Sequence, residues 1–401
     1  MNPTFANFHE AFMRRALELA RGGLGATHPN PMVGALIVEE GEIVAEGFHA
    51  KAGEAHAEIV ALRALGRKRA DGAILYVTLE PCCTQGRTPP CTEAILAAGI
   101  RQVVVGATDP NPRHAARGYE VLRAAGATVV TGVLAEECAD LNLIFNHWIA
   151  TNRPLLAAKI ATTIDGRIAC RTGESKWLTG ELARADVMRW RRLFPAIAVG
   201  AGTVASDDPQ LTARLPEGTW CPRRFIFDGA LSIATLNPLP RLLTDEWRAR
   251  TTIVTSERQH SVVVRKLEEL GVEVWRLPAE AAVVSIAAFS ERCAREGVTG
   301  VLVEGGSRLL SGLLQARAVD YLLAYRAPRV FADASSVPVA TGLRVELPTV
   351  GLRLTEVRHA LFGDDQLMRG RILYPDNLEI DAAPSNEADE TRHHHCGCDH
   401  D

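Results

Sequence analysis

One histidine and two cysteines in the first quarter of the chain have the chemistry of a catalytic zinc site: His56, Cys82 and Cys91. Two thiolates and a neutral imidazole balance the charge of a divalent ion, and a catalytic zinc keeps its fourth position open for water. A closed structural site would need a fourth protein ligand. Cys83 is the nearest further thiol. We expect it not to be a ligand, because adjacent cysteines chelate one ion poorly.

Glu58 follows His56 by two residues, and the stretch 56–65 has the pattern of a helix start. That offset can direct a carboxylate towards the open position, where it takes a proton from the activated water and passes it to a leaving amine. The pattern H-x-E followed by P-C and a later C is the signature of zinc-dependent base deaminases. The generic signature has about two residues between its cysteines. Here the longer insert 83–90 separates them, so we expect it to contact the substrate.

Each of these residues also has a plainer interpretation when it is taken alone. His56 could cap a helix, and the two cysteines could be small buried apolar side chains. The combination within one short span, with prolines marking a helix entry before Cys91, favours the metal site.

The elements that must hold these residues alternate between strands and helices. Strands are expected over 32–49 (two, around a turn at Glu40–Gly41), 73–80, 101–108 and 127–134, and helices over 8–20, 56–65, 92–99 and 116–126. This alternation predicts a three-layer α/β domain over residues 1–147.

The pattern restarts near 146–156, where a helix ends and Pro154 opens a new strand, and predicts a second α/β domain over 153–375. Its strand candidates are 155–161, 196–200, 223–228, 251–255, 272–275, 299–304 and 319–326. Its helix candidates are 181–193, 262–270, 285–296 and 307–316. Residues 376–401 are polar and acidic and are predicted to be a disordered tail, whose "HHHCGCDH" could bind metal only adventitiously.

Composition narrows the function classes. The chain has 401 residues, 47% of them hydrophobic, and a net charge of −4 without a long basic run, which argues against a general nucleic-acid or membrane-surface binder. The N-terminus does not read as a signal peptide, and charges interrupt every apolar run, so we expect a cytoplasmic protein. Nine unevenly spread cysteines make a poor disulfide framework and fit a reducing compartment.

In the second half, "LVEGGSRLL" reads as a buried strand, a turn at Gly305–Gly306 and an amphipathic helix. The helix start offers free N–H groups to a phosphate. The same pair of glycines also serves as a plain strand-to-helix turn, and the chain lacks the G-x-G-x-x-G dinucleotide fingerprint here.

Longer motifs carry a family resemblance. "PNPMVGALIV", "HAE", "YVTLEPC", "GRTPPC" and "DPNP" resemble the deaminase half of the bifunctional riboflavin-biosynthesis deaminase/reductase family, and "KIATTIDGRIA", "GESKWLTG", "GTVASDDPQLTAR" and "EGG" resemble its reductase half. The resemblance implies a cytidine-deaminase-like domain followed by a dihydrofolate-reductase-like domain. It also implies zinc-dependent deamination of 2,5-diamino-6-(5-phosphoribosylamino)pyrimidin-4-one, followed by NADPH-dependent reduction of the ribosyl group to ribityl.

Site residues follow from the matching motif positions. The resemblance places Asn30 in the pyrimidine pocket and Arg87 on the ribose phosphate. The resemblance implies that seven positions face the cofactor: Ala161, Trp177, Thr203, Asp207, Gly306, Ser307 and Arg308. It implies that five positions face the reductase substrate: Ser175, Arg191, Leu211, Arg214 and Glu304. These types suit their roles, because arginines pair with phosphate and a tryptophan covers a ring face. Lys159 could also reach the sugar, or be a surface lysine at a strand end.

Two rival interpretations remain. The chain could be a nucleic-acid base deaminase with an accessory binding domain, although interleaved basic and aromatic residues are lacking. It could also be a structural zinc protein whose second domain binds partners. We expect a small-molecule substrate rather than nucleic acid or a membrane, and a homodimer is our working assumption.

Overall fold

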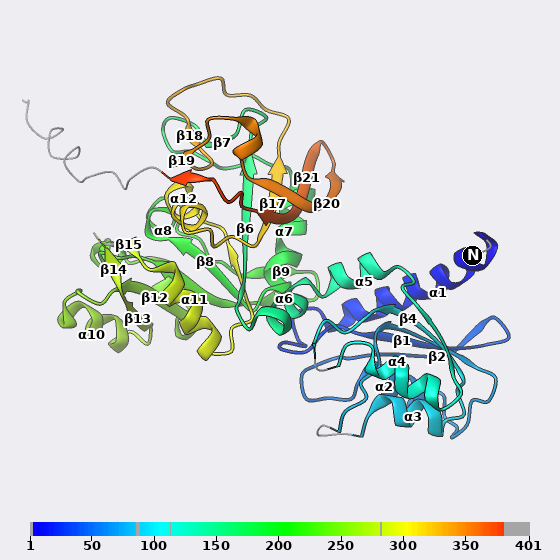
Figure 1. Ribbon diagram of the computed structural model, residues 1–401. Helices are drawn as coiled ribbons and strands as arrows, with labels where there is room; N and C mark the ends of the chain where they lie inside the picture. The colour runs from blue at the N-terminus through cyan, green and yellow to red at the C-terminus, as the bar shows by residue number, and fades with distance from the viewer. Residues whose placement is uncertain (1–2, 86–88, 113, 281–282, 381–401) are drawn as a thin grey trace, which may run out of the picture.

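The computed structural model describes residues 3–85, 89–112, 114–280 and 283–380, which form two α/β domains side by side (Figure 1). Two of the predictions, the role of Arg87 and the nature of residues 381–401, lie outside these ranges. Among the helices described, none combines the length and the apolar character that crossing a bilayer requires.

The first domain is a five-stranded sheet between two layers of helices, which confirms the predicted three-layer arrangement (Figure 1). The strand order is β2-β1-β3-β4-β5, with β3, β4 and β5 parallel and β1 antiparallel to both of its neighbours. The strands are β1 (Gly34–Glu39), β2 (Glu42–Phe48), β3 (Ile74–Leu79), β4 (Gln102–Ala107) and β5 (Thr128–Thr131). The helices are α1 (Pro3–Ala20), η1 (Arg21–Gly23), α2 (Ala57–Ala64), α3 (Cys91–Ala97), α4 (Arg117–Ala124) and α5 (Ala135–Leu141).

Helices α1 and α5 cover one face of this sheet, and α2, α3 and α4 cover the other (Figure 1). Strands β1 and β3 are therefore buried on both faces, which explains their nearly continuous apolar sequences. The predicted turn between β1 and β2 is confirmed. Glu40 and Gly41 have φ values of 48° and 85°, and a two-residue hairpin with this twist requires the left-handed region at both positions.

The second domain is built on a nine-stranded sheet of order β13-β12-β11-β8-β16-β6-β17-β21-β20. Its strands are β6 (Leu155–Thr162), β8 (Ala196–Gly200), β11 (Arg223–Phe227), β12 (Thr251–Ser256), β13 (Glu273–Leu277), β16 (Gly300–Val303), β17 (Tyr321–Arg326), β20 (Arg353–Phe362) and β21 (Asp365–Leu373). The strands from β13 to β17 are parallel, as their alternation with helices predicts.

Its helices are α7 (Glu181–Leu193), α8 (Ala201–Asp207), α9 (Arg241–Thr244), α10 (Ser261–Glu269), α11 (Ile286–Arg295) and α12 (Ser307–Gln315). Short pieces complete the domain: β7 (Arg167–Ala169), β9 (Ala213–Leu215), β10 (Gly218–Trp220), β14 (Ala279–Glu280), β15 (Val283–Val284), β18 (Val337–Pro338), β19 (Leu343–Arg344), β22 (Glu379–Ile380), η2 (Ser232–Thr235), η3 (Arg248–Arg250) and η4 (Pro348–Val350).

The antiparallel hairpin of β20 and β21 was not among the strands predicted from the sequence. It joins the sheet through β17, and β20 is the sheet's edge strand. None of the β20 residues is fully buried. A strand without a buried face does not need alternating apolar and polar residues, and that alternation is the signal by which a strand is recognised in a sequence. The predicted start of the disordered tail at residue 376 is wrong. β22 pairs with β19, and Leu378 is buried, so residues 376–380 belong to the second domain.

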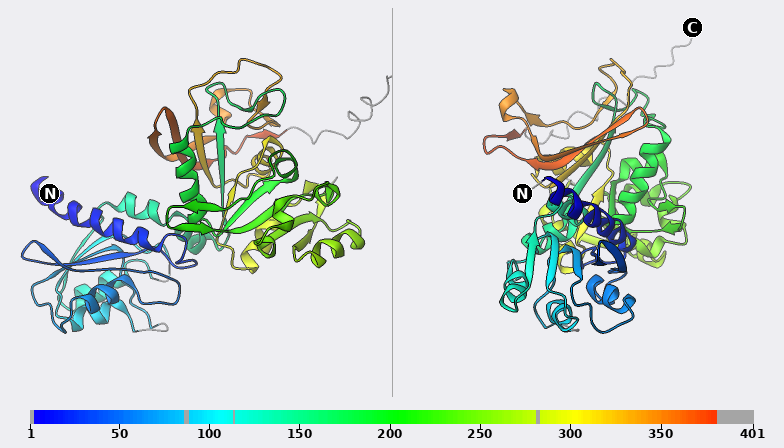
Figure 2. Two further views of the ribbon diagram at one scale, coloured as in Figure 1. Left: turned by 180° about the vertical axis from the view of Figure 1, so that it is seen from behind. Right: turned by 90° about the vertical axis from the view of Figure 1, so that its right-hand side faces the viewer.

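The two domains contact each other directly (Figure 2). Helix α6 (Leu143–Thr151) leads into β6, and its Leu143 and Ile144 belong to a buried cluster of the second domain. Arg369 on β21 forms a two-bond ion pair with Asp140 on α5, at 2.5 and 2.6 Å. The two sheets are thus held by both apolar and charged contacts.

Candidate active sites

The three predicted metal ligands lie together, although they come from three separate elements. His56 precedes α2, Cys82 follows β3, and Cys91 is the first residue of α3. His56 Nδ1 lies 3.3 Å from Cys91 Sγ and 3.6 Å from Cys82 Sγ, and all three ligand atoms are within 4.8 Å of one another. Two helix starts therefore face one another across a strand end, where their dipoles favour negative charge.

The chemistry of this set fits zinc. Hydrogen bonds from the thiol of Cys91 and the imidazole of His56 lower the pKa of Cys82, which favours its thiolate form. The same hydrogen bond and burial raise the pKa of Cys91, which holds the proton that the two sulfurs share. A divalent ion would replace that proton and stabilise both thiolates, as structural and catalytic zinc sites do.

Glu58 lies in the first turn of α2, only 3% exposed, and lines the same cavity as His56 and Cys82. Burial raises the pKa of its carboxyl to about 7. A cation bound by its neighbours would lower the pKa again, because an opposite charge favours the carboxylate. Such a group can both accept and release a proton near neutral pH.

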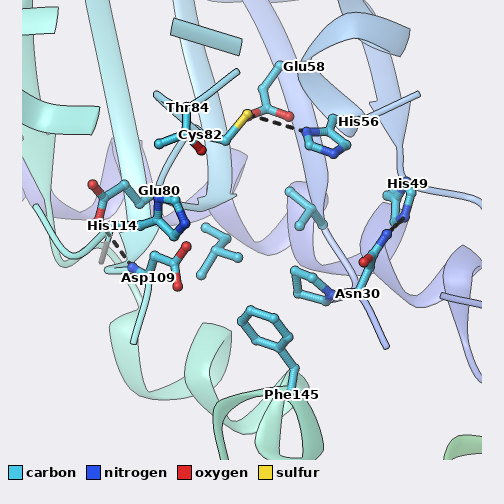
Figure 3. A pocket seen from close by; sticks show the side chains of 13 residues that line it. Asn30, His49, His56, Glu58, Glu80, Cys82, Thr84, Asp109, His114 and Phe145 are labelled. Carbon is cyan, nitrogen blue, oxygen red and sulfur yellow. Dashed lines mark hydrogen bonds between the residues drawn. The ribbon is translucent and has the colours of Figure 1, made fainter. Parts of the chain in front are cut away.

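The cavity around this cluster has a volume of about 290 Å³ (Figure 3). Its lining comprises Asn30, Pro31, Val33, His49, His56, Glu58, Leu79, Glu80, Cys82, Thr84, Asp109, His114 and Phe145. Of these residues, Asn30, His56, Glu58 and Cys82 were predicted from the sequence. No role was predicted for His49, Glu80, His114 or Phe145. Asp109 stands in the quoted "DPNP" motif, which is the one signal that could have identified it.

Asn30 is oriented by His49. Nδ1 of His49 donates to the carbonyl of Ala55 at 3.0 Å, so its Nε2 carries no proton in the neutral ring. Burial lowers the pKa of His49, which favours that neutral form. Nε2 therefore accepts a hydrogen bond from Asn30 Nδ2 at 3.2 Å. This leaves the Asn30 side-chain oxygen as an acceptor at the cavity.

A second group of predicted residues meets in the other domain, at the carboxyl ends of β6, β8 and β16. Three adjoining depressions of about 290, 690 and 450 Å³ lie there and share lining residues. Ligands of open parallel sheets bind at this end of the strands. The cofactor candidates line the first two depressions: Ala161, Trp177, Thr203, Asp207, Gly306, Ser307 and Arg308. The substrate candidates line the first and third: Ser175, Arg191, Leu211, Arg214 and Glu304.

A buried ion pair organises the substrate end of this cleft. Arg191 donates from Nε and Nη2 to the two carboxylate oxygens of Glu304, at 2.7 and 2.9 Å, and from Nη1 to the carbonyl of Thr212. Burial alone would raise the pKa of Glu304, but the charge and hydrogen bonds of Arg191 outweigh it and hold the pKa at about 2. Lys159 Nζ lies 4.0 Å from the same carboxylate.

Arg214 makes fewer hydrogen bonds than Arg191 and has no carboxylate among its hydrogen-bond partners. Its Nη1 donates to Thr212 Oγ1 at 2.9 Å and to Gln210 Oε1 at 3.2 Å. Trp177 is 68% exposed at the cleft, and the guanidinium of Arg184 lies over its ring, 4.5 Å from the centroid. Arg184 was not predicted to belong to the site, because a lone arginine in a helix is typically a solvated surface charge.

Two family models match the chain: "Cytidine and deoxycytidylate deaminase zinc-binding region" over residues 6–107 and "RibD C-terminal domain" over residues 154–367. The riboflavin biosynthesis protein RibD of Actinobacillus pleuropneumoniae is 39% identical over 364 residues, which cover 91% of this chain and 95% of that protein. RibD of Escherichia coli strain K12 is 38% identical, over 87% of this chain and 96% of its own length.

Solved structures of RibD proteins also match the chain across both domains. The chain is similar to Acinetobacter baumannii RibD, form 1, with a TM-score of 0.76, 33% identity, and coverage of 92% of this chain and 99% of that one. A diaminohydroxyphosphoribosylaminopyrimidine deaminase/5-amino-6-(5-phosphoribosylamino)uracil reductase from Thermotoga maritima matches with a TM-score of 0.76 and 36% identity, over 92% of this chain and all of that one. These matches confirm the predicted pair of α/β domains, a deaminase fold followed by a reductase fold.

Proposed function

Because the chain belongs to the RibD family of bifunctional riboflavin-biosynthesis enzymes, we propose which of its residues perform each of the two reactions. The chain is a zinc-dependent deaminase and an NADPH-dependent reductase. The first reaction replaces the 2-amino group of 2,5-diamino-6-(5-phosphoribosylamino)pyrimidin-4-one with oxygen from water and releases ammonia. The second reduces the ribosyl group to ribityl. We assign the first to residues 1–147 and the second to residues 153–375.

In the deaminase site His56, Cys82 and Cys91 would hold the zinc ion, which when bound would supply Lewis-acid activation of water. Glu58 takes a proton from the water and delivers it to the amine that leaves. Its place in the first turn of α2, buried and lining the same cavity as His56 and Cys82, supports this exchange of roles. The Asn30 oxygen, held in place by His49, accepts a hydrogen bond from the pyrimidine.

In the reductase site NADPH supplies the hydride when it is bound along Ala161, Thr203, Asp207 and the turn at Gly306. That turn opens α12, so Ser307 and Arg308 would hold the cofactor phosphates at a helix N-terminus. Trp177 would cover a ring face of the cofactor.

On the substrate side we assign the phosphate to Arg214, whose Nε and Nη2 donate no hydrogen bond within the described part of the chain. Arg191 fixes the carboxylate of Glu304, which then accepts hydrogen bonds from the sugar hydroxyls. Ser175 and Leu211 complete the wall of the pocket, and Lys159 stands beside Glu304.

One observation carries the proposal for the first site: three zinc-ligand side chains cluster within 4.8 Å, and His56, Cys82 and the buried carboxylate of Glu58 line one cavity beside them. The test follows ammonia release and NADPH oxidation separately on the authentic pyrimidine. We expect metal chelation to abolish ammonia release and to spare NADPH oxidation when the deaminated compound is supplied. If chelated enzyme still releases ammonia at the full rate, the metal site has no catalytic role.

We also propose that the chain acts on free small molecules in the cytoplasm, and that it forms a homodimer. The seven cysteines that the structure describes are all free, which supports a reducing compartment. A second domain of reductase type makes an accessory nucleic-acid platform unnecessary. Light scattering on the purified protein tests the dimer.

A further inference from the structure

Trp177 stands where the cofactor end and the substrate end of the reductase cleft meet. It lines the depression that contains Ala161 and Thr203, and it also lines the neighbouring depression that contains Arg214. The residue is 68% exposed, so burial does little to fix its rotamer. An indole that must lie flat against a ligand therefore needs another contact to hold it.

Arg184, near the start of α7, supplies such a contact. The carbon of its guanidinium lies over the indole of Trp177, 4.5 Å from the ring centroid. Its Nη1 donates to the carbonyl of Thr179 at 2.5 Å, two residues after the tryptophan. One side chain therefore contacts both the ring and the backbone that follows it. Arg184 lines the same two depressions as Trp177.

The start of the helix that carries Arg184 is itself anchored. The N–H of Gly180, which immediately precedes α7, donates to Asp365 Oδ2 at 2.6 Å, and the carbonyl of Gly180 accepts from the N–H of Arg184 at 3.2 Å. Asp365 is the first residue of β21 and only 4% exposed. A carboxylate shielded from water makes strong hydrogen bonds, so Arg184 projects from a fixed position.

We propose that Arg184 is a positioning residue of the reductase, which acts through Trp177. A guanidinium that stacks on one face of an indole leaves the opposite face for a planar ring of the cofactor. The inference rests on the assignment of Trp177 to the cofactor proposed above, and it adds the residue that holds the indole in place.

The experiment measures kcat and KM for NADPH oxidation on the deaminated substrate, with full-length, zinc-loaded enzyme carrying Arg184→Ala, Trp177→Ala or both substitutions. We expect Arg184→Ala to raise the KM for NADPH about fivefold, the size of effect that a partly exposed cation stacked on an indole produces. Trp177→Ala should raise this KM at least as much. In the Trp177→Ala background, loss of Arg184 should raise it no further, because the ring on which Arg184 acts is absent.

The ratio of kcat to KM effects separates positioning from a loss of folded protein. Unfolding of a fraction of the enzyme lowers the apparent kcat and leaves KM unchanged, whereas a weakened cofactor contact raises KM. Arg184→Lys keeps the positive charge without a planar fork, so it should recover only part of the affinity for NADPH. Arg189→Ala, at an exposed position on the same helix, is the matched control.

Failure of this inference can be told apart from failure of the assignment on which it rests. An unchanged KM for NADPH in Trp177→Ala would remove Trp177 from the cofactor site, and both would fail. An Arg184→Ala effect that persists in full in the Trp177→Ala background would overturn the positioning role alone. The same conclusion would follow from an unchanged KM in Arg184→Ala, or from a lysine variant that restores the affinity completely.

Discussion

The two sites of this enzyme differ in how their residues are distributed along the chain and in what holds them. The deaminase ligands and Glu58 all lie between residues 56 and 91, and they converge where two helices begin and one strand has just ended. The reductase candidates run from Ala161 to Arg308 and meet only because parallel strands end at one edge of a sheet. The first site is centred on one metal position, and the second is an open cleft organised by a buried ion pair.

The difference shows what each kind of chemistry demands. Zinc accepts few ligand types in a narrow geometry, so the residues that bind it are recognisable in a short sequence. Sugar hydroxyls, phosphates and a nicotinamide can be bound by many residue types and by backbone groups. The reductase site therefore depends more on the fold than on a compact motif.

The largest expected difference between the two sites comes from a substitution of Glu58, which carries the proton in the deaminase site. Glu58→Gln should lower ammonia release by a factor of about 10³, because the amide cannot accept a proton, while zinc content stays at the level of the unmodified enzyme. NADPH oxidation on the deaminated substrate should not change. Glu54→Gln, an exposed neighbour, is the control. Equal losses in both reactions would show that the two sites are not independent.

The ion pair of the reductase site gives the next largest effect. Glu304→Gln leaves the buried Arg191 without its counter-charge and should destabilise this domain by roughly 3 kcal/mol at neutral pH. The pKa of Glu304 is held at about 2, below its ordinary value of 4.5. The stabilisation is therefore complete above pH 4.5 and is lost as the pH falls towards 2.

Denaturant unfolding of both proteins across that pH range measures this effect. The difference in the free energy of unfolding should shrink below pH 4.5, and the exposed Glu181→Gln should show no such difference. A gap between wild type and Glu304→Gln that stays constant down to pH 2 would contradict the pKa shift.

The ion pair between Asp140 and Arg369 joins the two domains, so a substitution there tests whether the domains unfold together. Asp140→Asn removes the charge that pairs with Arg369 and should destabilise the docked arrangement by roughly 2 kcal/mol. We expect ammonia release and NADPH oxidation to be lost at different urea concentrations in this variant and at closer concentrations in the unmodified enzyme. Glu137→Gln, one turn earlier on α5, is the control. Coincident losses in the variant would mean that the apolar contact of α6 suffices.

The smallest predicted effect concerns the segment between β4 and α4, which contributes Asp109 and His114 to the lining of the deaminase cavity. Ala116 has a φ of 62°, a left-handed conformation that is costly for any residue with a Cβ atom. Ala116→Gly should therefore raise the stability of the first domain by about 1 kcal/mol. Ala115→Gly, at the preceding exposed position, should lower it. Calorimetry on both variants decides the sign, and a less stable Ala116→Gly protein would rule out strain at this position.

The amino-acid sequence by itself determined the two-domain α/β organisation and the metal chemistry. Alternating apolar periods set the helices and strands, and His56, Glu58, Cys82 and Cys91 have types that few structures other than a catalytic zinc site require together. The motifs also pointed to the residues that line the reductase cleft. These features depend on local pattern and on residue chemistry, both of which can be read along the chain.

Only the tertiary structure decided which hydrogen bonds these residues make. Arg191 pairs with Glu304, and the hydrogen bond between Asn30 and His49 leaves the Asn30 side-chain oxygen at the cavity. The tertiary structure also added β20 to the sheet edge and placed His114 in the lining of the deaminase cavity. Each of these facts depends on contacts between residues distant in sequence, because burial and hydrogen-bond partners exist only once separate segments have packed together.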